Sequence, residues 1–75
     1  MSKYDPLLAY LAARPGGLSV SFEEINRLVG GLPPSASRWR AWWANDPTHV
    51  HAHAWLDTGH RVDTVDLGRC ELTFS

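Results

Sequence analysis

Clusters of glycine and proline interrupt this 75-residue chain so often that only short helices and strands fit between them. Proline removes a backbone donor and glycine favours turns, so each cluster ends regular structure. The interruptions lie at Arg14-Pro15-Gly16-Gly17, Gly30-Gly31-Leu32-Pro33-Pro34, Asn45-Asp46-Pro47, Gly59 and Gly68. A chain of this length has room for one core, and we expect a single domain over residues 1–75.

The first two segments each carry a helix start signal and one apolar face. Asp5 can cap the first helix, and Pro6 suits its first position, where no backbone donor is needed. Ser21 and Glu24 form a capping box at the start of the second helix. A short strand, Leu18-Ser19-Val20, is expected between the two helices. The expected core positions recur at helical spacing: Leu7, Leu8, Leu11, Phe22, Ile25 and Leu28.

Two further helices are predicted in the middle of the chain. The third begins at Pro34 or Ser35 and runs to about Trp43. The fourth begins at a Thr48 cap and ends at Gly59.

The last part of the chain has the alternation of a β-hairpin. Gly68-Arg69 is expected as a two-residue turn, in a register that pairs Val65 with Leu72. In this register the apolar residues share one face, which we expect to point to the core: Val65, Leu67, Cys70, Leu72 and Phe74. Val62 is out of phase with that face, so a bulge is expected near Asp63.

The predicted fold class is therefore α+β, with about four N-terminal helices, one short strand and a C-terminal hairpin. Winged-helix domains have the same order with one helix fewer, and their short strand joins the hairpin, or wing, in one sheet. This loose winged-helix likeness is an analogy of element order, so it carries no function by itself.

Arginine and tryptophan are concentrated in the segment 35–45, which is the candidate binding site. Arginine binds phosphates or a guanine edge, tryptophan offers a stacking plane, and asparagine can bind an adenine edge. The second and third helices would act as a helix-turn-helix pair, with the hairpin tip as a wing contact to phosphate. The predicted nucleic-acid-binding residues are Arg38, Arg40, Trp42, Asn45 and Arg69. We expect DNA as the ligand, with RNA less favoured.

Other interpretations of this segment stay open. Large aromatic residues dominate small cores, so each tryptophan can also be a core residue with solvated arginine neighbours. Trp39, Trp42 and Trp43 cannot all face inward, however, and at least one is expected at the surface. The net charge of −1 argues against a general attraction to phosphate. The alternative function is a protein-interaction module of a phage-related or defence-related system, and a homodimer is another way for so small a chain to bury apolar surface.

Catalysis, a cofactor and a bound metal are not expected. The chain has no Gly-rich phosphate loop, nucleophile elbow or His-Glu-x-x-His motif, and little volume is expected for a substrate cavity of ~300 Å³ or more. His49 and His53 have the spacing of two zinc ligands on a helix, but no second cysteine or carboxylate cluster completes the set. The single Cys70, the lack of an apolar run near ~20 residues and the lack of a signal-peptide pattern predict a cytoplasmic protein.

Six strings of residues carry a resemblance to a known family: Lys3-Tyr4-Asp5-Pro6-Leu7, Ser21-Phe22-x-Glu24-Ile25, Leu32-Pro33-x-Ser35-Ala36, Ala54-Trp55-Leu56-Asp57-x-Gly59, Val65-Asp66-Leu67 and, most specific, Arg40-Ala41-Trp42-Trp43-Ala44-Asn45-Asp46. With these the chain resembles, over nearly its whole length, a small uncharacterised bacterial domain family. Such domains occur alone and joined to nuclease modules of the GIY-YIG type, which implies DNA-related work but no established activity. Members of the family have an aromatic residue in place of His60 and varied polar residues in place of His51 and His53, so the resemblance implies no histidine metal site.

Overall fold

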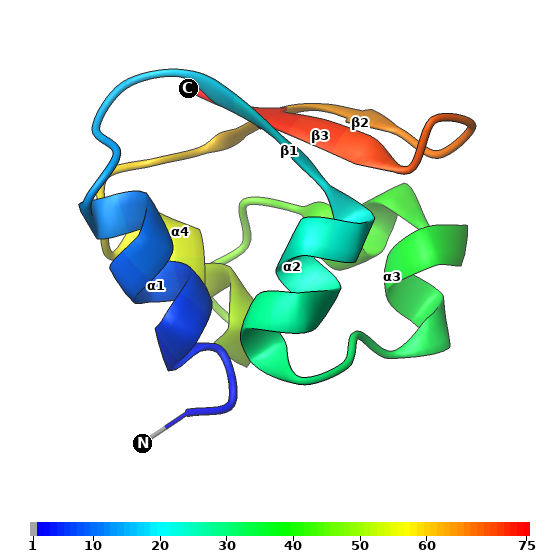
Figure 1. Ribbon diagram of the computed structural model, residues 1–75, viewed down its shortest axis with the longest axis horizontal. Coiled ribbons are helices and arrows are strands. Elements are labelled where there is room, and N and C mark those ends of the chain that lie inside the picture. The colour runs from blue at the N-terminus through cyan, green and yellow to red at the C-terminus, as the bar shows by residue number, and fades with distance from the viewer. Residues whose placement is uncertain (1) are drawn as a thin grey trace.

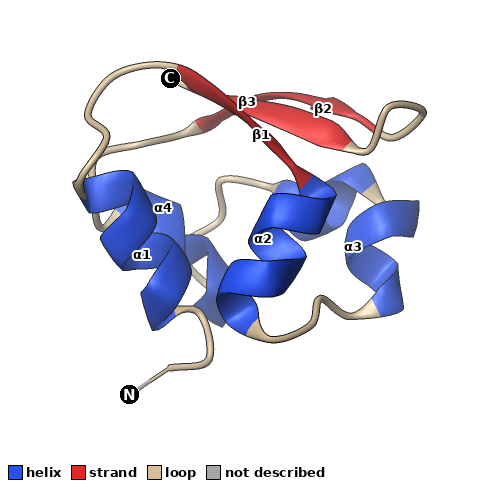
Figure 2. Cartoon of the chain, viewed as in Figure 1, coloured by secondary structure: helices blue, strands red, loops and turns tan. Residues whose placement is uncertain are grey.

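The computed structural model describes residues 2–75, and Met1 of the expected domain lies outside the described residues. Its elements follow in the order α1 (Asp5–Ala12), β1 (Leu18–Ser21), α2 (Phe22–Val29), α3 (Pro34–Arg38), the 3-10 helices η1 (Arg40–Trp43) and η2 (Val50–Ala52), α4 (His53–Leu56), β2 (Val62–Asp66) and β3 (Glu71–Phe74). The sheet lies across one side of the helices, so the molecule has two layers (Figure 1, Figure 2). The predicted α+β class is confirmed.

The sheet has three antiparallel strands in the order β1-β3-β2, so β3 is central. Leu72 of β3 lies opposite Val20 of β1 and Val65 of β2, which confirms the predicted hairpin register. The register shifts between Val62 and Thr64, and this confirms the predicted bulge. The first strand thus joins the hairpin in one sheet, as the order of elements predicts.

The loop of the hairpin differs from its prediction. The ladder ends at the pair Asp66 and Glu71, so the loop spans residues 67–70 instead of two residues. Cys70 is exposed, and the prediction that it faces the core is wrong. Its φ of 54° lies in the left-handed region, which interrupts the alternation of a strand and turns the side chain away from the apolar face. The Asp66 carboxylate accepts a hydrogen bond from the Arg69 N–H at 3.0 Å and fixes the loop.

The core between the two layers contains most of the predicted residues. Leu7 and Leu11 of α1, Phe22 and Ile25 of α2, and Leu72 and Phe74 of β3 are all buried, whereas Leu8, Leu28, Val65 and Leu67 are half-buried. Two tryptophans complete the core: Trp43 and Trp55, each with 1% or less of its surface exposed. The Trp43 ring stacks on Phe22 with 5.3 Å between centroids. Aromatic bulk therefore fills the centre of this small domain.

The helix start signals are used in part. Asp5 is the first helical residue of α1 and not its cap, and its carboxylate accepts a hydrogen bond from the Ser2 N–H. Ser21 caps α2 as predicted, because its hydroxyl accepts a hydrogen bond from the Glu24 N–H at 3.1 Å. The Glu24 carboxylate pairs with Arg27 at 2.6 Å, so only half of the capping box is formed.

The fourth predicted helix is shorter than expected. Asp46, and not Thr48, organises its start, since one Asp46 carboxylate oxygen accepts hydrogen bonds from both the N–H and the hydroxyl of Thr48. The chain then forms η2 and the single turn of α4 before Gly59. Gly59 has a φ of 81°, and the predicted end of the helix is therefore confirmed.

His60 connects the chain after α4 to the residues that follow α1. Its ring is 3% exposed, and Nε2 donates a hydrogen bond to the Arg14 carbonyl oxygen at 3.0 Å. The ring also stands edge-on to Phe74. This histidine is a core residue in a place where sequence reasoning assigned it no role.

Candidate nucleic-acid interface

The predicted third helix is broken at Trp39, and the break creates the most exposed aromatic surface of the described chain. Trp39 has extended backbone angles, φ −127° and ψ 120°, between the end of α3 and the start of η1. Its N–H donates to the Ser35 carbonyl and its own carbonyl accepts from the Trp42 N–H, so it joins the two turns. The Trp39 side chain is 63% exposed. A continuous helix from Ser35 to Trp43 was therefore a wrong prediction.

Burial of a neighbouring tryptophan explains the break. The Trp43 indole N–H donates a 2.7 Å hydrogen bond to the Ala36 carbonyl oxygen of α3. In a continuous helix the Ala36 carbonyl oxygen would accept the Arg40 N–H, and Trp43 would lie about 10 Å further along the helix axis, out of reach of that carbonyl. The chain turns back at Trp39, buries Trp43 and satisfies its indole N–H, which outweighs the lost helical hydrogen bonds.

Arg38 and Arg40 flank the exposed indole on both sides. Both residues are exposed, and within residues 2–75 neither takes part in an ion pair. The stretch 25–45 contains no aspartate or glutamate. This segment of the chain therefore carries a positive charge, although the whole chain carries a net charge of −1.

Arg69 lies on the loop of the hairpin, which projects on the same side of the molecule as α3 (Figure 1). Its side chain is 78% exposed and lies 3.9 Å from the Glu71 carboxylate. So long and exposed a contact contributes little and leaves the guanidinium available.

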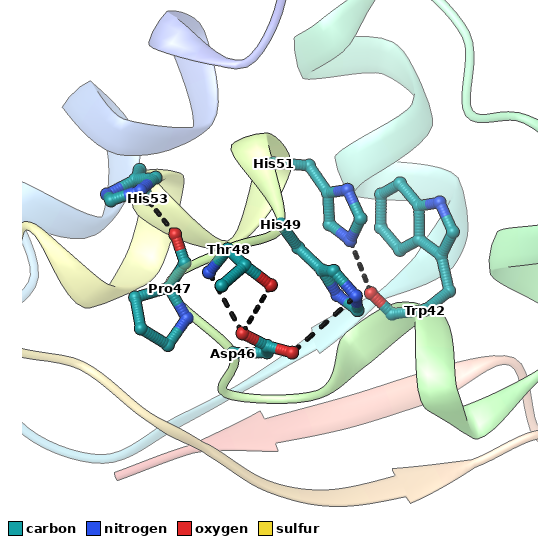
Figure 3. Close-up of polar contacts among 7 residues, drawn as sticks. All are labelled: Trp42, Asp46, Pro47, Thr48, His49, His51 and His53. Carbon is teal, nitrogen blue, oxygen red and sulfur yellow. Dashed lines mark hydrogen bonds and ion pairs between the residues drawn. The ribbon is translucent and has the colours of Figure 1, made fainter.

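Trp42 does not present a free ring. Its indole stacks on the His51 ring, with 3.8 Å between centroids and an interplanar angle of 4° (Figure 3). The His51 Nε2–H donates a hydrogen bond to the Trp42 carbonyl oxygen, and Tyr4 and Trp43 contact the indole at steep angles. One face of Trp42 is thus covered, and the exposed ring that the segment was expected to contain is Trp39.

Asn45 has a structural position. Its Oδ1 accepts hydrogen bonds from the Trp55 indole N–H at 3.0 Å and the Val62 N–H at 2.8 Å. Its Nδ2 donates to the Val62 carbonyl oxygen at 2.9 Å. The amide connects η1, α4 and β2 and lacks the free edge that reading an adenine requires, so Asn45 is left out of the interface.

A groove of about 420 Å³ opens between α2, α3 and the hairpin loop. Its walls are apolar, formed by Phe22, Leu32, Pro33 and Pro34, and Glu23, Asn26 and Ser37 add polar groups. Cys70 lines the side that belongs to the hairpin loop. The expectation of little cavity volume was therefore wrong: the short, irregular helices leave a hollow of the size of a small-molecule site.

The rings of His49 and His53 lie apart from each other (Figure 3), whereas the rings of His49 and His51 are neighbours with 5.4 Å between centroids. His49 faces Asp46, whose carboxylate lies 3.8 Å from the His49 Nε2, whereas His53 contacts Pro47 and Asp57. His49 precedes η2 and is not on the helix of His53, so the four-residue spacing does not bring the two rings together. Among residues 2–75, no group of three or more His, Cys, Asp or Glu side chains could hold a metal ion.

Hydrogen bonding and burial shift the pKa values of His51, His53 and Asp46 in different directions. Burial lowers the pKa of His51, against a smaller opposite effect of its bond to Trp42, and this favours the neutral ring that stacks on the indole. Hydrogen bonds to Asp57 and the Pro47 carbonyl raise the pKa of His53, because a protonated ring donates to both. The Thr48 hydroxyl and N–H lower the pKa of the Asp46 carboxyl.

Trp39 and the groove were missed as functional features. The string Arg38-Trp39-Arg40 could have predicted the exposed indole, because a residue between two arginines is rarely buried in a core. The groove had no such signal, because its residues come from three separate elements.

No helix in residues 2–75 is long and apolar enough to cross a membrane. No curated protein and no solved structure matches the chain. The model of one family, described as Domain of unknown function (DUF7662), matches residues 4–75, which is nearly the whole chain. The chain therefore belongs to this uncharacterised domain family.

Proposed function

We propose that this chain is a nucleic-acid-binding module, with DNA favoured over RNA, that uses Arg38, Trp39 and Arg40. The observation that carries the proposal is a 63% exposed indole between two exposed arginines that have no ion-pair partner within residues 2–75. An indole at the surface is unfavourable in water, and a flanking pair of guanidinium groups suits phosphate on either side of a stacked base. Binding, and not catalysis, is the proposed activity.

Arg69 extends this interface across the hairpin loop. A contact of this loop with phosphate corresponds to the wing of winged-helix domains, and the similar order of helices and strands along the chain supports that part of the proposal by analogy. The resemblance to domains joined to GIY-YIG nuclease modules also favours DNA, and we place the module in the cytoplasm. Trp42 is left out of the proposed contacts, because its indole stacks on the His51 ring.

The test is a titration of labelled duplex and single-stranded oligonucleotides followed by fluorescence anisotropy, at low and at physiological salt. Arg38→Ala and Arg40→Ala should each weaken binding without lowering the melting temperature, because both side chains are exposed. Trp39→Ala should weaken single-strand binding about fivefold or more through lost stacking.

Arg61→Ala is the matched control. Arg61 is also exposed, and its replacement by alanine also removes one positive charge. It precedes β2, however, and so lies at the end of that strand opposite to the hairpin loop. Its removal should leave binding unchanged within about twofold if the interface is local. Equal losses in all three arginine variants would indicate unspecific attraction, and no saturable binding at low salt would refute the proposal.

The second candidate is a protein-interaction module, as in a phage-related or defence-related system. The net charge of −1 favours it, because duplex-binding domains usually carry a basic surplus. The exposed Trp39 would then be the anchor of a protein interface, or of a homodimer. This alternative would be established if the chain binds no oligonucleotide but binds a partner protein or a second copy of itself, and if Trp39→Ala abolishes that association.

A further inference from the structure

The groove beside α3 lies between the two arms that carry the proposed phosphate contacts. Ser37 lines the groove and directly precedes Arg38, while Cys70 lines it and directly follows Arg69. A strand whose phosphates contact both arms would therefore pass over the mouth of the groove. The residues that line the groove would then contact a base of that strand.

We propose, on the basis of the nucleic-acid binding inferred above, that the groove takes one unpaired base that carries an exocyclic amino group. Its volume of about 420 Å³ lies in the range of small-ligand sites, and its apolar lining suits the apolar face of a base. A duplex hides that face within its stack, so the groove and the exposed Trp39 both select single strands.

The polar lining decides which base is preferred. Glu23 is exposed and has no ion-pair partner within residues 2–75, so its carboxylate is an open acceptor. The Ser37 hydroxyl donates to the Pro34 carbonyl, which leaves its oxygen free to accept. The Asn26 Oδ1 is used by the Leu32 N–H at 2.7 Å, and the Asn26 amide keeps its N–H groups as donors.

Two acceptors can take the two N–H groups of one exocyclic amino group while the amide of Asn26 donates to an acceptor of the same base. Cytosine and adenine carry a ring nitrogen acceptor next to the amino group, and guanine carries a donating N1–H there with O6 beyond it, so all three fit these groups. A carboxylate is a natural acceptor for the amino group of cytosine. Thymine and uracil present carbonyl oxygens on both sides of one N–H, and these oxygens would meet the negative charge of Glu23. The same charge keeps phosphate out of the groove and on the arginine rims.

The first experiment compares affinities for the labelled single strands dC10, dA10 and dT10 and for a duplex of mixed sequence. Binding to dC10 should be at least about fivefold tighter than binding to dT10, and tighter than binding to the duplex. Glu23→Gln removes the charge and keeps the shape, and it should bring dC10 and dT10 to within about twofold. Its melting temperature should fall by no more than a few degrees, because Glu23 is exposed, makes no ion pair with residues 2–75 and contributes only its charge in the first turn of α2.

The second experiment reads occupancy of the groove directly. Cys70 is the only cysteine of the chain, is exposed and lines the groove, so its alkylation by iodoacetamide reports access to that site. Saturating dC10 should slow the alkylation at least about fivefold, and saturating duplex should not. The Arg61→Ala variant, which leaves the groove intact, should show the same protection as the natural chain.

The outcomes separate this inference from the function on which it rests. Binding that depends on Arg38 and Arg40, with equal affinity for dC10 and dT10 and no protection of Cys70, overturns the base site and leaves nucleic-acid binding standing. Stronger binding to the duplex overturns it as well. Absence of binding to all four oligonucleotides overturns both proposals.

Discussion

Replacing Asn45 by alanine should destabilise the fold and not act on ligand binding directly. The change removes two acceptor contacts, to the Trp55 indole N–H and the Val62 N–H, and one donor contact, to the Val62 carbonyl oxygen. Each intramolecular hydrogen bond contributes about 1 kcal/mol net, and a buried donor left without a partner costs about 1–3 kcal/mol. Trp55 is fully buried, whereas water can reach the part-buried surroundings of Asn45, so we expect a total loss of about 2–4 kcal/mol.

The assay is urea unfolding followed by tryptophan fluorescence. A domain of this size has a free energy of unfolding of about 4–11 kcal/mol, so the transition should move to clearly lower urea with little change in slope. Asn26→Ala is the matched control, because Asn26 is the other asparagine of the chain, is exposed and makes one side-chain bond, to the Leu32 N–H. Its loss should stay near 1 kcal/mol. A loss below about 1 kcal/mol for Asn45→Ala, or weaker oligonucleotide binding at full stability, would refute the structural role.

Four further expectations concern stability. Ile25→Ala should lower the free energy of unfolding by about 2–5 kcal/mol in urea, since Ile25 is fully buried. A loss below about half a kcal/mol would show that the buried face of α2 has been assigned wrongly. Trp39→Ala should change the melting temperature by no more than a degree or two, because Trp39 is exposed. Because the pKa of His51 is lowered in the folded state, this side chain is protonated at a higher pH in the unfolded chain than in the folded one. Its contribution to stability should therefore be full above about pH 6.5 and fall as the pH drops below that value. His51→Gln should reduce this fall in melting scans between about pH 5 and 8. His53 acts in the opposite direction, because its raised pKa gives a contribution that is present below about pH 6.5 and is lost as the pH rises through the folded pKa, and His53→Gln should show which residue dominates. Zinc or a chelator should leave the melting temperature unchanged, and a large zinc-dependent rise that His49→Ala abolishes would contradict the geometry of the histidines.

Most of the fold could be predicted because local patterns and tertiary packing agree there. In the hairpin, alternation places Leu72 and Phe74 on the buried face, and a slip by one residue would expose both, so the register follows from the sequence. The helix α2 likewise has a capping serine at one end and Gly30 in the left-handed conformation at the other.

The prediction failed where a distant contact overrides local preference. The segment that begins at Ser35 has no internal breaker, yet the hydrogen bond between the Trp43 indole and the Ala36 carbonyl forces a turn at Trp39. Cys70 left its expected face because the loop residue takes a positive φ, which alternation alone does not reveal.

The predicted site residues divide into a surface group and a group that contributes to the fold, and the binding role of the surface group stays a prediction. Arg38, Arg40 and Arg69 are exposed, as an interface needs, but Trp42 and Asn45 contribute to the fold. Their roles depend on His51, Trp55 and Val62, which come from later parts of the chain. No periodicity within residues 35–45 contains that information.

The salt dependence of binding tests the central claim most directly. The logarithm of the association constant for a single-stranded oligonucleotide should fall linearly with the logarithm of salt concentration, with a slope that reflects the few phosphates held by Arg38, Arg40 and Arg69. Each Arg→Ala change at these three positions should make the slope shallower by about 0.7, and Arg61→Ala should leave it unchanged. Slopes that stay the same in all three variants, or no saturable binding at low salt, would contradict an interface built on the Arg38-Trp39-Arg40 turn.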